Sequence, residues 1–395
     1  MPEMKGLGRT LSGLEVFLGE HASSHEGESL GLLMNQASVG PGYEDALSLL
    51  DARLPGAVSC LFGPQHGFRG ESQDNMVESP HSRTADGREI HSLYSGDLEP
   101  SERMLEGLDW VVCDLQDAGT RVYTFAHTLS LLLGKCAGAG VGVIVLDRPN
   151  PIGGDLVEGN LLDPDCGSFV GLHPIPMRHG LTMGELARLM NGRLKEPARL
   201  EVVPMRGWRR SYAFRDTGLP WVPPSPNLPT PETALVYPGT VIFEGTNLSE
   251  GRGTTQPFQL VGAPYVDPKA LKSDLDRLGL PAVAFREAAF QPCFNKWAGL
   301  GCRGVAIHPT GKAFRPYLTA LAILSSILRR HPSDFALKEP PYEYEYERRP
   351  IDLILGRKGI FDALADGACP KELCEGFKGE EDLFRRSVRD HLLYA

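Results

Sequence analysis

The feature that most constrains the fold is an alternation of apolar runs with helix-like segments through the first third of the chain. Apolar runs occur at residues 30–35, 57–63, 110–115 and 141–147, and apolar side chains at helical spacing occur at 43–54 and 123–138. Strands that are apolar on both faces and separated by helices are typical of a parallel sheet covered on both sides. The sequence therefore predicts a doubly wound α/β domain.

A second, smaller domain is predicted after a proline-rich segment. At 395 residues the chain is longer than one core usually organises. Residues 218–232 contain six prolines and are expected to form neither a helix nor a central strand, so we place the junction there, with domains at 1–225 and 226–395. Residues 240–245 and 303–309 read as strands and residues 268–279 and 315–331 as helices, which predicts a mixed α/β C-terminal domain.

Polar residues follow three of the predicted strands. The segments GPQHGFRGESQD, DLQDAGTR and DRPNPIGGD begin at residues 63, 114 and 147. Ligands bind outside the carboxyl ends of strands in sheets of this kind. Residues 63–96 are also too many for a simple connection between strand and helix, and loops of this length are usually functional. We therefore expect an active site at this edge of the sheet, with residues 63–96 as an active-site loop.

Charge and composition limit the partners and the location. The 40 lysines and arginines are outnumbered by 50 aspartates and glutamates, which argues against a nucleic acid or an anionic membrane as partner. The N-terminus shows no signal-peptide pattern and no run is long enough to span a membrane, which predicts a cytoplasmic protein. Eight cysteines without a CxxC spacing are expected to be reduced thiols.

Carboxylates dominate the predicted site. Acids at strand ends or in polar loops are Glu71, Asp74, Glu78, Asp114, Asp117, Asp147, Glu158, Glu244 and Glu250. Glycoside hydrolysis uses two carboxyl groups about 5 to 9.5 Å apart, or one acid and a substrate amide. Three histidines, His66, His81 and His91, share the long loop with several of these acids and leave a metal site as an alternative, although their spacing matches no compact metal motif.

The motifs also carry a family resemblance. The segments FGPQHGFRG, VVCDLQDAGTRVYTF, VLDRPNPIGG, PMRHGLTMGELA and SPNLPTPETALVYPGTVIFEGTNLSEGRGTTQPF resemble the NamZ-type exo-β-N-acetylmuramidases. The resemblance implies a Rossmann-like N-terminal domain, a smaller C-terminal domain, a cleft between them and no cofactor. It also implies release of N-acetylmuramic acid from the non-reducing end of peptidoglycan fragments, with a guanidinium from Arg69, Arg121, Arg148 or Arg252 on the lactyl carboxylate of the sugar.

One position departs from the family pattern. Many members have glutamate where this chain has Gln65, and an amide cannot act as a general acid or base near neutral pH. The catalytic role is therefore predicted for Glu71 or Glu78, as the acid, and for Asp114 or Asp117, which would activate water or orient the acetamido group. The predicted substrate-binding residues are Gln65, His66, Arg69, Gln116, Arg121, Tyr123, Arg148, Asn150, Glu244, Asn247, Glu250 and Arg252. A non-catalytic carbohydrate-binding protein and a metal-dependent hydrolase remain the alternatives.

Overall fold

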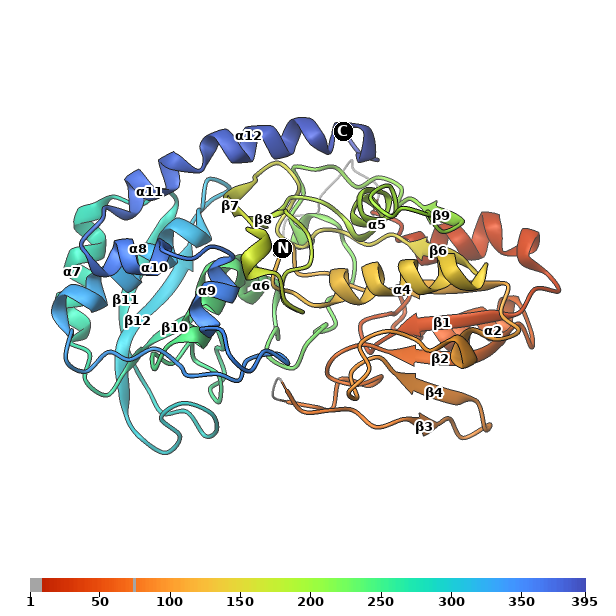
Figure 1. Cartoon of the computed structure of the whole chain (residues 1–395), viewed down its shortest axis with the longest axis horizontal. Helices are drawn as coiled ribbons and strands as arrows, with labels where there is room; N and C mark the ends of the chain where they lie inside the picture. Colours follow the sequence, from red (N-terminus) through yellow and green to blue (C-terminus); the bar gives the residue numbers. More distant parts are fainter. Residues whose placement is uncertain (1–8, 74–75) are drawn as a thin grey trace.

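The computed structural model describes residues 9–73 and 76–395, and its first half is built on a seven-stranded sheet in the order β3-β4-β2-β1-β5-β6-β9 (Figure 1). Neighbouring strands are parallel except for β3, which pairs antiparallel with β4 at the edge. The strands are β1 Leu30–Met34, β2 Val58–Gly63, β3 Ser82–Arg83, β4 Glu89–Ser92, β5 Trp110–Asp114, β6 Gly142–Leu146 and β9 Leu200–Val203. The predicted doubly wound α/β fold is confirmed.

Helices cover both faces of this sheet because each strand is apolar on both faces. In β1, Leu30 and Leu32 pack with α1 and α2, whereas Leu33 points to the opposite face and packs with α4 and α5. The helices of this half are α1 Gly13–Val16, α2 Ala46–Arg53, α3 Glu102–Leu105, α4 Phe125–Ala139 and α5 Met183–Asn191. A capping box begins α5, since the Thr182 hydroxyl accepts from the Glu185 N–H and the Glu185 carboxylate accepts from the Thr182 N–H.

The second half contains a three-stranded antiparallel sheet, β10-β12-β11, with helices packed around it. Its elements are α6 Pro231–Thr240, η5 Val241–Gly245, β10 Leu260–Ala263, α7 Pro268–Leu278, β11 Val283–Phe290, β12 Cys302–Pro309, α8 Pro316–Arg330, α9 Pro350–Leu355, α10 Ile360–Ala365, α11 Pro370–Gly376 and α12 Lys378–Ser387. One hydrophobic cluster runs from the α4 face of the large sheet into this half. We retain the division at residues 225 and 226 as a proposal, since the two sheets lie on either side of it along the chain.

The two halves are also joined by a small sheet and by the C-terminus. Strands β7 (Glu158–Leu161) and β8 (Pro176–Arg178) form a separate antiparallel pair, and α12 packs against β7 (Figure 1). Beyond α12 the chain returns to the first half, where the Tyr394 hydroxyl donates to Asp147 Oδ2 at 2.5 Å.

Two local predictions were wrong. Residues 241–245, read as a strand, form a 3-10 helix that continues α6, because a short buried apolar run does not distinguish a strand from a buried helix. Part of the long loop at 63–96 is not loop, because β3 and β4 within it extend the sheet.

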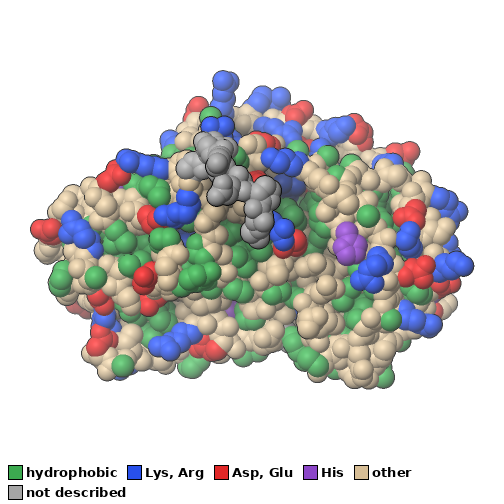
Figure 2. Space-filling view, turned by 180° about the vertical axis from the view of Figure 1, so that it is seen from behind, with side chains coloured by type: hydrophobic (Ala, Val, Ile, Leu, Met, Phe, Trp, Pro, Cys, Tyr) green, Lys and Arg blue, Asp and Glu red, His purple; other side chains and the backbone are tan. Residues whose placement is uncertain are grey.

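Among residues 9–73 and 76–395, no helix has both the length and the apolar character needed to cross a membrane. On the face in Figure 2, acidic and basic side chains are interspersed.

Candidate active site

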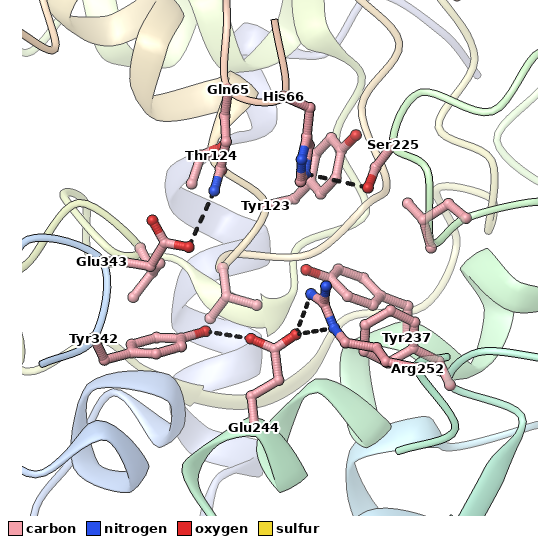
Figure 3. A pocket seen from close by; sticks show the side chains of 14 residues that line it. Gln65, His66, Tyr123, Thr124, Ser225, Tyr237, Glu244, Arg252, Tyr342 and Glu343 are labelled. Carbon is pink, nitrogen blue, oxygen red and sulfur yellow. Dashed lines mark hydrogen bonds and ion pairs between the residues drawn. The ribbon is translucent and has the colours of Figure 1, made fainter. Parts of the chain in front are cut away.

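A cavity lies where the carboxyl ends of β2 and β5 meet the second half of the chain (Figure 3). Its volume is about 30 Å³, which is enough for about one water molecule. The lining residues come from both halves and are Gln65, His66, Val122, Tyr123, Thr124, Val170, Ser225, Leu228, Tyr237, Glu244, Arg252, Phe258, Tyr342 and Glu343. The position agrees with the ligand site expected at the strand ends of a doubly wound sheet.

Gln65, two residues beyond the end of β2, holds a fixed place in this cavity. Its side-chain oxygen accepts from the Thr124 hydroxyl at 2.5 Å, and its Nε2 donates to Glu343 Oε1 at 3.0 Å and to the Tyr94 hydroxyl at 3.1 Å. The amide is buried and its oxygen and nitrogen are both engaged. The amide therefore orients a carboxylate from the other half of the chain.

His66, beside it, has a backbone φ of 73°, in the left-handed region that favours glycine. Its Nδ1 donates to the carbonyl of Ser72 at 2.9 Å, which leaves Nε2 to accept from the Ser225 hydroxyl at 3.2 Å (Figure 3). Strained backbone of this kind is found at functional sites, where the surrounding structure holds it. The imidazole thus presents a polar edge of the cavity.

Glu343 is a cavity residue that the sequence analysis missed. It lies between α8 and α9, it is 3 % exposed, and its Oε2 accepts from the Tyr94 hydroxyl at 2.6 Å. Its backbone φ of 46° is again in the left-handed region. The signal in the sequence was the alternation of tyrosine and glutamate over residues 342–347, which follows two prolines.

Glu244 is the second carboxylate of the cavity. Its Oε1 accepts from Arg252 Nε at 3.1 Å and Nη2 at 2.5 Å, and its Oε2 accepts from the Tyr342 hydroxyl at 2.8 Å (Figure 3). Burial opposes ionisation, but Arg252 and the Tyr342 hydroxyl outweigh it and hold the pKa of Glu244 below its usual value. Glu244 is therefore a fixed negative charge at neutral pH.

The cavity wall also contains a hydroxyl without a protein partner. The phenol of Tyr123 is buried, and among the residues that the structure describes nothing forms a hydrogen bond with its oxygen. Burial raises the pKa of Tyr123 well above its usual value, with smaller contributions from Tyr237 and Asp117. A buried hydroxyl that is not satisfied within the protein is a natural contact for a bound ligand.

A second pocket adjoins the cavity and shares Glu244 and Arg252 with it. It has a volume of about 250 Å³ and is lined in addition by the predicted residues Asn247 and Glu250. Glu250 Oε2 lies 2.5 Å from Lys296 Nζ, and the Asn247 side chain bonds to Tyr265 and to the Asp334 carbonyl. Of the predicted binding residues, the structure thus places Gln65, His66, Tyr123, Glu244, Asn247, Glu250 and Arg252 in the cavity or the adjoining pocket.

Other predicted residues are committed to internal contacts outside the cavity. Asp114 and Arg148 form a buried bidentate pair, with Nε 2.5 Å from Oδ1 and Nη2 2.7 Å from Oδ2. Within the described residues, the Arg121 guanidinium donates to carbonyl groups, among them those of Asn160 and Leu355. The side-chain amides of Gln116 and Asn150 donate to backbone carbonyls, and Asp117 Oδ2 accepts from the Gly119 N–H at 2.6 Å. Their placement argues against the roles predicted for them.

The predicted acids of the long loop lie on the surface. Glu71, Glu78 and Arg69 are exposed and do not line the cavity, and Glu71 Oε2 accepts from the Arg69 N–H at 3.1 Å. Asp74 lies outside the described residues. His81 and His91 pack against each other with ring centroids 6.1 Å apart. Within residues 9–73 and 76–395, no group of three histidines, cysteines or acids is arranged to hold a metal ion.

Comparison with known proteins identifies one family over most of the chain. Residues 30–232 match the N-terminal region of the exo-β-N-acetylmuramidase NamZ family, and residues 235–394 match its C-terminal region. The chain is 36 % identical over 384 residues to the peptidoglycan β-N-acetylmuramidase NamZ of Bacillus subtilis, an alignment that covers 97 % of this chain and 91 % of that protein.

Two solved structures have the same fold, and both are DUF1343 family proteins from Bacteroides fragilis. One superposes with a TM-score of 0.89 at 31 % identity, covering 98 % of this chain and 99 % of that one. The other has a TM-score of 0.76 at 26 % identity with the same coverage. The family prediction made from the motifs is confirmed, and the chain belongs to the exo-β-N-acetylmuramidase NamZ family.

Proposed function

We propose that this protein is a glycosidase that releases N-acetylmuramic acid from the non-reducing end of peptidoglycan fragments. Family membership supports the activity and the substrate class. The observation that supports the chemistry is that Glu244 and Glu343, about a hundred residues apart in sequence, line one cavity at the strand ends. A pair of carboxyl groups is what glycoside hydrolysis uses.

The two carboxyl groups are in different environments, which suggests different roles. Glu244 is held ionised by Arg252, so its charge would stabilise the positive charge that develops at the anomeric carbon. Glu343 accepts hydrogen bonds from the uncharged side chains of Gln65 and Tyr94 and would carry the proton. In the proposed reaction Glu343 donates a proton to the glycosidic oxygen, the bond from that oxygen to the anomeric carbon breaks, and water then adds to the carbon and returns a proton to Glu343.

Gln65 has a supporting role in this proposal. Its amide cannot supply the proton, but it donates to Glu343 Oε1 and accepts from Thr124, and these bonds fix the Glu343 carboxyl at the strand end. The departure from the family pattern at position 65 is then compatible with catalysis, because the acid comes from the second half of the chain.

Substrate binding requires the cavity to widen. A volume of about 30 Å³ does not accommodate a sugar ring, and the segment between α8 and α9 that carries Tyr342 and Glu343 forms one wall. We propose that the cavity widens as the sugar enters while Glu343 keeps its contact with Gln65, and that the Tyr123 hydroxyl then finds its partner on the sugar.

The test compares two substrates with different leaving groups. Wild-type protein is expected to release N-acetylmuramic acid both from 4-nitrophenyl β-N-acetylmuramide and from a β-linked N-acetylmuramyl–N-acetylglucosamine disaccharide. Glu343→Gln is expected to lower kcat about 100-fold or more on the disaccharide and much less on the nitrophenyl glycoside, because nitrophenolate leaves without a proton. The matched control is Glu347→Gln, an exposed acid in the same segment, which should leave both rates unchanged.

The same assay separates catalysis from binding alone. Gln65→Glu would place a second carboxyl group about 3 Å from Glu343. If the wild type released no sugar from either substrate and Gln65→Glu did, the chain would be a carbohydrate-binding protein that has lost its acid, and the assignment to Glu343 would be wrong. If Glu343→Gln lost the same factor on both substrates, Glu343 would not be the proton donor.

A further inference from the structure

A pocket of about 490 Å³ between the two halves of the chain has no role in the proposed reaction. It shares no lining residue with the cavity that contains Glu343. Its walls are partly apolar, with Ile152 and Leu156 from the first half and Leu235 and Phe314 from the second. We call it the Arg178 pocket, after the cation in its wall.

Arg178 lies at the end of β8 and is 6 % exposed. Its Nη1 donates weakly to the Phe314 carbonyl at 3.4 Å and its Nη2 donates to the Ile152 carbonyl, whereas Nε has no hydrogen-bond partner among the described residues. No carboxylate of the described chain lies within ion-pair distance of this guanidinium, whereas Arg148 pairs with Asp114 and Arg252 lies near both Glu244 and Glu250. A buried cation without a counterion is costly, because burial removes its hydration and gives nothing in return.

The acid that acts most strongly on this charge, Glu158, compensates it only in part. Glu158 faces Arg178 across the β7–β8 pair, but its carboxylate accepts the Tyr317 and Leu318 N–H groups at the start of α8. Burial raises the pKa of Glu158 to about 7, so that near neutral pH it is only partly ionised. Burial lowers the pKa of Arg178 only to about 10, so the arginine keeps its charge.

The other charged residues of the pocket leave an excess of positive charge. Lys312 at the rim donates to the Ser211 carbonyl at 2.9 Å, and Arg210 is paired with Glu185 at 2.7 Å. Asp155, the acid in the lining, is exposed. The pocket thus combines apolar walls with one desolvated guanidinium that has no ion-pair partner among the described residues.

We propose that the Arg178 pocket binds a small monoanion with an apolar body, such as an aryl or alkyl carboxylate or sulfonate, whose charged group lies against Arg178. The ligand would supply the counterion that the protein lacks, and the apolar walls would cover the rest of it. The site is separate from the proposed catalytic cavity, although α6 contributes a residue to each, Leu235 here and Tyr237 there.

Two fluorescent probes with the same ring system test the proposal. 8-Anilinonaphthalene-1-sulfonate carries a sulfonate, and N-phenyl-1-naphthylamine lacks it. Titration of the wild-type protein is expected to show one site with at least tenfold tighter binding of the sulfonate. Arg178→Met should lower the affinity for the sulfonate at least tenfold and leave that for the neutral probe unchanged. The matched control is Arg329→Met, an exposed arginine on α8, which should bind as the wild type does.

A second variant keeps the test decisive if Arg178→Met does not fold. Ala313 is an exposed residue of the lining, so Ala313→Trp fills space in the pocket without touching the arginine. It should weaken binding of both probes. Equal affinity of the two probes, no binding of either, or wild-type binding of the sulfonate by a folded Arg178→Met or by Ala313→Trp would overturn the proposal.

Discussion

Two buried carboxylate–arginine pairs in this molecule look alike in the sequence and differ in the structure. Asp114 with Arg148 and Glu244 with Arg252 were all predicted site residues, and in each pair the closest nitrogen–oxygen distance is 2.5 Å. Both oxygens of Asp114 are bound by the same guanidinium. Glu244 gives one oxygen to Arg252 and the other to Tyr342, and it lines the cavity.

The difference shows what turns an ion pair into part of a site. In the Asp114–Arg148 pair, the two charges bind each other, and Arg148 Nη2 also donates to the Val39 carbonyl. All of these contacts lie within the first half of the chain. The Glu244–Arg252 pair lies between the proposed catalytic cavity and the adjoining pocket. We therefore expect the first pair to stabilise the fold and the second to act on a ligand.

The largest effect is expected on stability, when the Asp114–Arg148 pair loses one partner. Asp114→Asn leaves Arg148 buried without its counterion, which should lower the free energy of unfolding by about 3–5 kcal/mol, as is usual for a buried pair that loses one partner. Urea denaturation followed by circular dichroism measures this. The activity per folded molecule should stay near that of the wild type. A loss of stability below about 1 kcal/mol, or a specific loss of turnover, would remove the contrast between the two pairs.

Glu244→Gln should lower activity more than stability, the reverse of Asp114→Asn. It removes the fixed charge from the cavity, and we expect kcat/KM for the disaccharide to fall about 100-fold, or about 2.7 kcal/mol. The loss of stability should be smaller than for Asp114→Asn, roughly 1–2 kcal/mol, because Glu250 Oε1 lies 3.5 Å from Arg252 Nε and keeps a counterion near it. Activity at the wild-type level in this variant would show that Glu244 serves structure alone.

A third buried acid extends the comparison, because none of the arginines in the described part of the chain forms an ion pair with it. Asp147 Oδ1 accepts from the Gly184 N–H at 2.7 Å and Oδ2 from the Tyr394 hydroxyl at 2.5 Å, yet burial raises the pKa of Asp147 to about 7. Since this pKa is higher in the folded than in the unfolded chain, the contribution to stability is present at low pH and is lost as pH rises toward 7.

Asp147→Asn should therefore flatten the pH dependence of the free energy of unfolding between about pH 4 and 7, by roughly 1–3 kcal/mol. Urea denaturation at several pH values measures the slope. Glu244 should behave in the reverse sense, since its pKa is lowered: its contribution is present above the unfolded pKa and is lost as pH falls through the folded pKa. A wild-type slope in Asp147→Asn would show that Asp147 is ionised throughout this range.

The sequence predicted those features that depend on neighbouring residues. The strands of the large sheet are apolar on both faces, so their positions could be predicted directly from the sequence. The different roles of Asp114 and Glu244 could not be predicted from the sequence, because they depend on which of the two carboxylates lines a cavity after folding. Glu343 was missed for the same reason: it reaches Gln65 across 278 positions of the chain. The loop acids were favoured only because they were near Gln65 in sequence.

The smallest effect is expected at those loop acids. Glu71 and Glu78 are exposed and lie outside the cavity, so Glu71→Gln and Glu78→Gln should each change kcat/KM for the disaccharide less than twofold. The same assay that detects the loss in Glu244→Gln measures both. A tenfold loss in either variant would mean that the loop carries its carboxylate to the substrate when the cavity opens. Proximity in sequence to Gln65 would then have been the better guide to the acid, and the contact between Gln65 and Glu343 would belong to the resting state alone.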